Sequence, residues 1–153
     1  MRVYFAKILG LKIHKLTKES LFKLVWDVVD KNKRATIGNV NLHALYISIF
    51  NKEFRRYLDS TIANYIDGMS LVLLGNLKRY SFKSENRITS LDWIIDFFER
   101  CKQRDIKVFI LGGKKDVAEK AISLFSEKCP GLEMEIHHGY FNKNVNSVEN
   151  KHV

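Results

Sequence analysis

The feature that most constrains this fold is an alternation of short apolar, β-prone runs with longer segments of helical spacing. Such an alternation favours a parallel sheet covered by helices. The predicted strands span residues 34–37, 61–66, 106–111 and 132–136, and the predicted helices span residues 18–30, 41–50, 53–58, 68–74, 90–101 and 115–128. Two further runs, residues 3–8 and 11–14, are separated by Gly10 and predict a hairpin. We therefore expect an α/β protein with a Rossmann-like, open, mostly parallel sheet, helices on both faces and a preceding N-terminal hairpin.

Charge and composition narrow the class of partner. The chain has 153 residues, 46% hydrophobic residues and a formal net charge of +9, which together indicate one globular domain. A phosphate-bearing substrate, an anionic membrane face or a nucleic acid would each suit that charge. Because Lys and Arg are spread along the sequence and no nucleic-acid-binding motif is present, no nucleic acid is expected as a partner. Scattered, solvated lysines are the alternative explanation of the charge.

The expected location is the cytoplasm, with contact to the membrane at its inner face. No segment reaches the roughly 18 apolar residues needed to span a bilayer. The N-terminal stretch has lysines within its apolar part, which is not typical of a signal peptide. Cys101 and Cys129 lack CxxC spacing and are predicted to be reduced thiols.

Asp67 is the strongest candidate for a chemical role. It follows the apolar run of residues 61–66 and precedes Gly68, where a buried strand is predicted to stop and a helix to begin. In open α/β sheets, ligands bind in the crevice at that edge. A carboxylate there can accept a proton from a substrate hydroxyl. The alternative is structural, since aspartate is also a favoured helix N-cap and would then bond the backbone of Met69 or Ser70.

The other polar candidates carry weaker signals. Gly112–Gly113 follows a predicted strand and opens a helix, which suits a phosphate or an ordinary turn. Arg87 ends a polar, basic segment, residues 77–87, predicted to be a mobile loop, where it could clamp a diphosphate or lie exposed. His137–His138 does not predict a metal site, because adjacent strand residues point to opposite faces. Asp92 falls on the polar side of a predicted helix.

Several segments together resemble one family. The opening ILGLKIHKLTKES is similar to a Gly-x-x-Ile/Val and Leu-Thr pattern, and the stretch from Gly38 to His43 places Asn41 after a buried strand. IDGMS follows, and NRITSLDW resembles an Arg-x-Thr-Gly-x-Asp segment. LGGKKDVAEKA and PGLEMEIHHGYF are the most specific pieces. From about Ile8 to Phe141 the chain resembles the WecG/TagA/CpsF glycosyltransferases, bacterial enzymes of teichoic-acid, enterobacterial-common-antigen and exopolysaccharide synthesis.

The resemblance implies inverting transfer of an N-acetylmannosamine-type or related sugar from a UDP donor to a saccharide on undecaprenyl diphosphate. It implies no metal and no cofactor. Asp67 would deprotonate the acceptor hydroxyl, and Arg87 would stabilise the departing UDP diphosphate. The implied substrate-binding residues are Asn39, Asn41, Asp92, Gly112 and Gly113.

The chain also departs from the family pattern. Asn39 stands where many relatives have Thr, and Ser90 where they often have Gly. Relatives continue past Gly-Tyr-Phe into another strand, a Gly-x-Pro-x-Gln-Glu-type loop and a basic membrane-docking tail. We therefore expect residues 1–141 to form a glycosyltransferase domain that is incomplete at its C-terminus, and residues 142–153 to be a disordered tail. The alternative function is a truncated, non-catalytic nucleotide-binding or assembly module.

Overall fold

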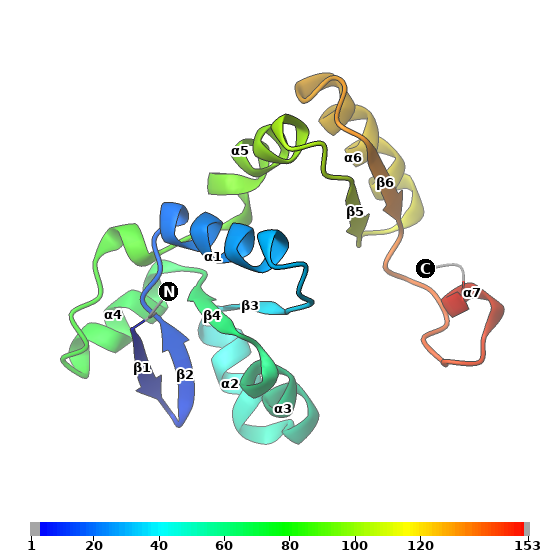
Figure 1. Ribbon diagram of the computed structural model, residues 1–153. Helices are drawn as coiled ribbons and strands as arrows, with labels where there is room; N and C mark the ends of the chain where they lie inside the picture. The colour runs from blue at the N-terminus through cyan, green and yellow to red at the C-terminus, as the bar shows by residue number, and fades with distance from the viewer. Residues whose placement is uncertain (1–3, 152–153) are drawn as a thin grey trace. The chain divides into compact units, whose positions relative to one another are not determined.

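The computed structural model describes residues 4–151 and divides into two compact units, Met1–Trp93 and Ile94–Val153 (Figure 1). The N-terminal unit contains β1 (Phe5–Ile8), β2 (Leu11–His14), α1 (Lys18–Asp30), β3 (Ile37–Val40), α2 (Leu42–Phe50), α3 (Lys52–Ser60), β4 (Ala63–Ile66), α4 (Met69–Leu77), η1 (Ser84–Asn86) and the start of α5 (Ser90–Gln103). The C-terminal unit contains the rest of α5, β5 (Val108–Leu111), α6 (Lys115–Lys128), β6 (Met134–His137) and α7 (Val148–Lys151). The predicted α/β class is confirmed.

The N-terminal hairpin forms as predicted. β1 and β2 pair antiparallel, and their two connecting residues, Leu9 and Gly10, have φ of +49° and +78°. Positive φ at both positions is the backbone that a tight two-residue hairpin turn requires. The inward side chains of the hairpin join one core cluster with α2 and α4, through Ala6, Ile8, Leu11 and Ile13.

β3 and β4 pair in parallel and are the centre of the N-terminal unit. Every residue of β4 is buried, because Ala63 and Tyr65 pack with α1 on one side while Ile66 packs with α2 and α4 on the other. A strand covered on both faces has no need of polar alternation. The burial explains why residues 61–66 carry so strong an apolar signal.

The predicted position of β3 was wrong by about three residues. We expected a strand over residues 34–37 closed by Gly38, but the strand runs over Ile37–Val40. Gly38 lies inside it, paired with Asn64 of β4. A β-carbon at Gly38 would lie 2.2 Å from Asn64 Oδ1, so the glycine permits a close side-chain approach instead of ending the strand.

A buried network of hydrogen bonds connects the hairpin to β4. The Asn64 side chain is 1% exposed and donates to the carbonyls of Leu58 (2.8 Å) and Lys12 (3.2 Å). The backbone N–H of Asn64 donates to Nδ1 of the buried His14 at 2.9 Å. The backbone N–H of Asn64 can only donate a hydrogen bond, so His14 Nδ1 must be unprotonated to accept it.

This bond predicts a pH-dependent stability. Burial lowers the pKa of His14 below its ordinary value of 6.5, so the unfolded chain binds more protons between the lowered value and 6.5. The contribution of His14 is therefore fully present above about pH 6.5 and is lost as the pH falls through the lowered pKa. Urea unfolding over that range should show a shallower pH dependence for His14→Asn, which can accept the same bond without titrating. The matched variant of an exposed histidine, His43→Asn, should keep the wild-type slope, and equal slopes in all three proteins would contradict the assignment.

Residues 77–87, which were predicted to be a mobile loop, make hydrogen bonds to several other parts of the unit. Asn76 and Phe82 exchange two hydrogen bonds of 2.8 and 2.6 Å, and Tyr80 Oη donates to the Lys7 carbonyl at 2.6 Å. Phe82 and Asn86 are buried, and Asn86 Nδ2 donates to the Leu16 carbonyl at 3.1 Å. The prediction of a loose segment was therefore wrong, because long-range partners compensate for its polar composition.

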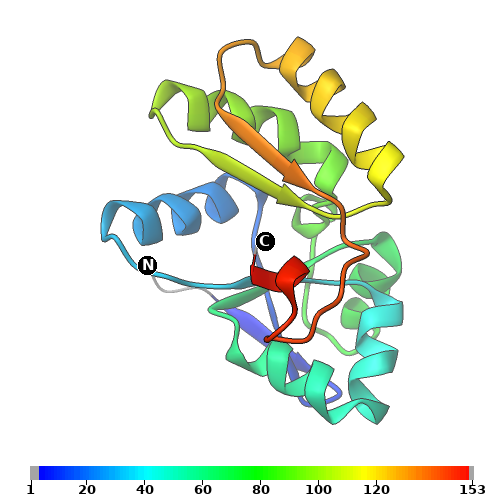
Figure 2. The same ribbon diagram turned by 90° about the vertical axis from the view of Figure 1, so that its right-hand side faces the viewer.

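The C-terminal unit is a second strand–helix–strand motif. β5 and β6 pair in parallel, and α6 lies alongside them in both views (Figures 1 and 2). Phe98 of α5 is buried and makes an edge-to-face contact with Phe125 of α6, with ring centroids 5.1 Å apart. Cys101 and Cys129 are buried free thiols. The division at residues 141 and 142 stays a prediction, and α7 lies within the segment that we expected to be a disordered tail.

Candidate functional site at the carboxyl edge of β3 and β4

Three neighbouring chain segments end at one edge of the N-terminal unit. β3 lies on one side of β4, and the segment at Arg87 lies on the other, paired in parallel with Ile66. The Ile88 N–H donates to the Ile66 carbonyl at 2.8 Å and fixes that position. This edge therefore carries Asn39 and Asn41 from the first segment, Asp67 from the second and Arg87 from the third.

The Asp67 carboxylate follows the end of β4 and does not cap a helix. The N-cap residue of α4 is Gly68, at φ +111°, and the Asp67 side chain instead accepts from Asn39 Nδ2 at 3.4 Å. The register explains that contact, because Asn39 pairs with Tyr65, two residues before Asp67 and on the same face. The N-cap interpretation of Asp67 is therefore wrong, and its half-buried carboxylate lies at the predicted edge.

Asn41 has a structural role that its spacing did not reveal. It is the N-cap of α2, and its Oδ1 accepts from the Ala44 N–H at 2.8 Å. Val40 accepts the backbone N–H of Asp67 at 2.8 Å, so the residue before Asn41 is joined directly to Asp67. A role for Asn39 or Asn41 in substrate binding stays a prediction.

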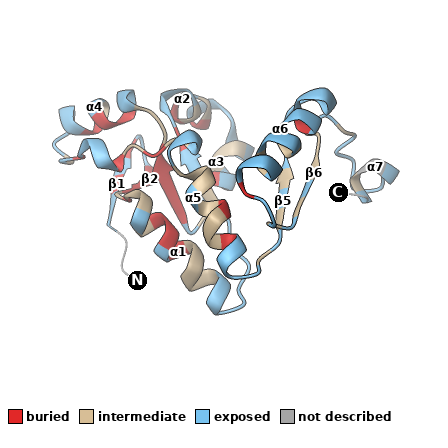
Figure 3. Cartoon of the chain, turned by 90° about the horizontal axis from the view of Figure 1, so that it is seen from above, coloured by how far each residue is buried: buried red, intermediate tan, exposed pale blue. Residues whose placement is uncertain are grey.

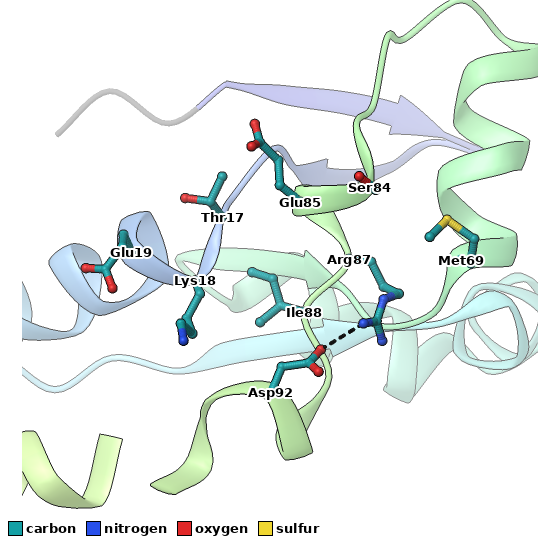
Figure 4. Close-up of a pocket in the computed structure, with 9 residues that line it drawn as sticks. All are labelled: Thr17, Lys18, Glu19, Met69, Ser84, Glu85, Arg87, Ile88 and Asp92. Carbon is teal, nitrogen blue, oxygen red and sulfur yellow. Dashed lines mark ion pairs between the residues drawn. The ribbon is translucent and has the colours of Figure 1, made fainter. Parts of the chain in front are cut away.

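Arg87 and Asp92 form an ion pair at the same edge. Their Nη2 and Oδ2 atoms are 3.2 Å apart (Figure 4). Asp92 Oδ2 also accepts from the backbone N–H and the hydroxyl of Thr89, at 2.9 and 3.0 Å. These two bonds, with a further contribution from the Arg87 charge, lower the pKa of Asp92. Asp92 is thus an ionised group that orients the Arg87 guanidinium. The sequence had predicted only that Asp92 lies on the polar side of a helix.

A pocket of about 540 Å³ opens beside this ion pair (Figure 4). It is lined by Thr17, Lys18, Glu19, Met69, Ser84, Glu85, Arg87, Ile88 and Asp92. The structure thus brings Arg87 and Asp92 together in the pocket, whereas Asp67 lies outside its lining, two residues before Met69. Sequence reasoning missed Thr17, Lys18 and Glu19 as lining residues, although the LTKES motif that contains them was a usable signal.

The glycine pair belongs to the C-terminal unit and is described apart from this edge. Gly113 has a φ of +71°, which suits glycine, and α6 begins two residues later. The Gly112 N–H donates to the His137 carbonyl at 3.0 Å, and the Gly113 carbonyl accepts from Gly139 at 2.9 Å. Any phosphate at this turn would therefore need donors other than the Gly112 N–H, and phosphate binding here stays a prediction.

The expectation that His137 and His138 point to opposite faces was wrong. β6 ends at His137, and the two rings stack with centroids 4.4 Å apart. The alternation rule fails because His138 lies beyond the strand. Within residues 4–151, no group of three or more His, Cys, Asp or Glu residues is placed to bind a metal ion.

The fold defines an α/β protein whose parallel strands end at one edge. That edge is a candidate ligand site, because it carries an acid, two amides and an arginine. The chain belongs to the glycosyl transferase WecG/TagA/CpsF family, whose model matches residues 6–152, and the resemblance seen in the motifs is confirmed. It is 24% identical over 106 residues to the N-acetylglucosaminyldiphosphoundecaprenol N-acetyl-beta-D-mannosaminyltransferase of Bacillus subtilis (strain 168). That match covers 69% of this chain and 41% of the length of the relative.

Proposed function

We propose that this chain takes part in inverting transfer of an N-acetylmannosamine-type sugar from a UDP donor to a saccharide linked to undecaprenyl diphosphate. The family supports the class of reaction, and the name of the Bacillus relative supports the sugar and the lipid-linked acceptor. The proposed location is the inner face of the cytoplasmic membrane, where such a carrier is accessible. The proposed contact with the membrane is peripheral. No helix among the described residues is long and apolar enough to cross a bilayer.

The observation that carries the proposal is the placement of Asp67. Its carboxylate stands at the end of a strand buried on both faces, and Asn39, not the backbone of α4, is its hydrogen-bond partner. A carboxylate that capped a helix would accept hydrogen bonds from the backbone N–H groups of that helix and would be less available to a substrate. That the Asp67 carboxylate is not used as a helix cap supports its proposed role as the proton acceptor.

The proposed reaction is a single displacement. The Asp67 carboxylate accepts the proton of the acceptor hydroxyl as that oxygen bonds to the anomeric carbon of the sugar. The bond from the anomeric carbon to the β-phosphate oxygen breaks on the opposite face, which inverts the centre and releases UDP. Arg87, oriented by Asp92, matches the charge of the departing diphosphate.

The test is product formation by the chain itself. The purified protein is incubated with UDP-N-acetylmannosamine and undecaprenyl-diphosphate-linked N-acetylglucosamine, and the lipid-linked disaccharide is measured by mass spectrometry. We expect time-dependent product and an equal amount of released UDP. Calorimetric binding of UDP without any product would instead identify the chain as a non-catalytic nucleotide-binding module and would overturn the proposed transfer by this chain.

A further inference from the structure

Lys18 occupies a position where the fold of α1 does not favour a cation. It is the first residue of the helix, directly after the N-cap Thr17. The backbone N–H groups of a helix give its N-terminal end a partial positive charge, which favours acidic residues there and disfavours basic ones. The buried stretch of α1, red in Figure 3, consists of Leu21, Phe22 and Leu24. Packing of the helix therefore does not explain a lysine at position 18.

Lys18 lies at the same pocket as the ion pair of Arg87 with Asp92. Both cations line the cavity of about 540 Å³. Two hydrogen bonds from Thr89 lower the pKa of the Asp92 carboxyl, and the charges of Arg87 and Lys18 lower that pKa further. A single carboxylate is thus acted on by two cations that come from distant parts of the chain.

The two glutamates that line the pocket lie away from this group of charges. Figure 4 shows the Glu85 carboxylate pointing away from the ion pair. Glu19 lies on the far side of Lys18 from Asp92 in the same view. Around Asp92, two positive charges therefore stand against one negative charge. A net positive charge beside the positive end of a helix suits an anionic ligand that carries more than one charge.

We propose that Lys18 and Arg87 together bind one diphosphate group, with Lys18 as a second cation that the sequence did not identify. The planar guanidinium of Arg87 can donate to two phosphate oxygens, while the ammonium group of Lys18 acts as a point charge. A bound diphosphate would also be attracted by the N-terminal end of α1, so it would offset the unfavourable placement of Lys18. Lys18 is then a residue whose cost to the helix is compensated when the ligand binds.

The assignment of this diphosphate to UDP rests on the proposed function. The donor and the lipid-linked acceptor both carry a diphosphate. The donor is favoured, because Asp67, the proposed partner of the acceptor hydroxyl, lies outside the pocket lining. In the proposed displacement the UDP leaves on the face of the sugar opposite to that hydroxyl. The diphosphate of the donor is therefore the one expected beside Arg87.

Isothermal titration calorimetry of the full chain tests the inference without an acceptor. The probes are UDP, inorganic pyrophosphate and uridine. Lys18→Gln should weaken the binding of UDP and pyrophosphate about tenfold, as expected for the loss of one charge-assisted hydrogen bond, and should leave uridine binding unchanged. Added salt should weaken UDP binding more in the wild type than in Lys18→Gln. Lys18→Arg should retain most of the affinity, because the charge remains.

The matched control is Lys23→Gln, which removes an exposed lysine of the same helix that does not line the pocket. It should bind UDP as the wild type does. Lys18→Gln should unfold at no lower a temperature than the wild type, because a cation is removed from the positive end of α1. Wild-type UDP affinity in Lys18→Gln would overturn the inference, and so would a wild-type chain that binds neither UDP nor pyrophosphate.

The transfer assay distinguishes the donor from the acceptor and this inference from the proposed function. Lys18→Gln should raise the KM for UDP-N-acetylmannosamine and leave the KM for the lipid-linked acceptor unchanged, whereas the reverse pattern would overturn the assignment to UDP. If Lys18→Gln weakened UDP binding but the wild type formed no disaccharide, the inference would stand and the proposed transfer would fail. If both proteins formed disaccharide with equal kinetic constants, only the inference would fail.

Discussion

Asp67→Asn should slow sugar transfer by about 10²–10⁴-fold, the usual contribution of a positioned general base. Asparagine has the same shape and can keep the contact with Asn39, but it cannot accept the proton of the acceptor hydroxyl. Folding and UDP affinity should therefore change little. The measurement is the initial rate of lipid-linked disaccharide formation, compared with UDP affinity by calorimetry and with the thermal midpoint.

The matched control is Asp59→Asn. Asp59 is an exposed acid of the same unit that pairs with Arg55 at 2.9 Å and lies on α3, away from the carboxyl edge. It should transfer sugar at the wild-type rate. Wild-type turnover in Asp67→Asn would refute the assigned base, and it would leave Asp67 as a residue that merely holds the edge in place through Asn39.

Local patterns were sufficient to predict the elements that depend on nearby residues. The helix predicted over residues 18–30 is α1, and its N-cap Thr17 forms a reciprocal capping pair with Ser20. The hairpin around Gly10 follows from a turn that needs positive φ. In each case the residues that determine the structure lie within a few positions of one another.

Features that depend on distant partners could not be predicted. From the sequence, Gly38 was predicted to end a strand. Its actual role depends on the distant residue Asn64, whose side chain occupies the space that a β-carbon at Gly38 would need. Likewise, the polar composition of residues 77–87 predicts mobility unless the contact from Tyr80 to the hairpin is known. Asp67 was assigned to the correct edge because a strand end is a local signal. Its partner Asn39 depends on the register between β3 and β4, which the sequence alone leaves open.

The ion pair of Arg87 with Asp92 predicts a second large effect on transfer. Arg87→Gln should reduce the rate by about 10²–10³-fold, since removing one preorganised group from a developing anion has effects of that size. The backbone of Arg87 pairs with Ile66 whichever side chain is present, so the fold should be retained. Inhibition by UDP should weaken in parallel, because the leaving diphosphate is the proposed partner of the guanidinium.

Comparison with lysine separates charge from geometry. Arg87→Lys keeps the positive charge but loses the planar fork that binds a diphosphate through two donors, so it should recover only part of the lost rate. Asp92→Asn should give a smaller defect than Arg87→Gln, because the guanidinium remains but one of its orienting charges is gone. Arg34→Gln removes an exposed arginine of the same unit and should leave transfer and UDP inhibition unchanged. If Arg87→Gln behaves like Arg34→Gln, then Arg87 is an ordinary exposed arginine whose ion pair serves only to hold the start of α5.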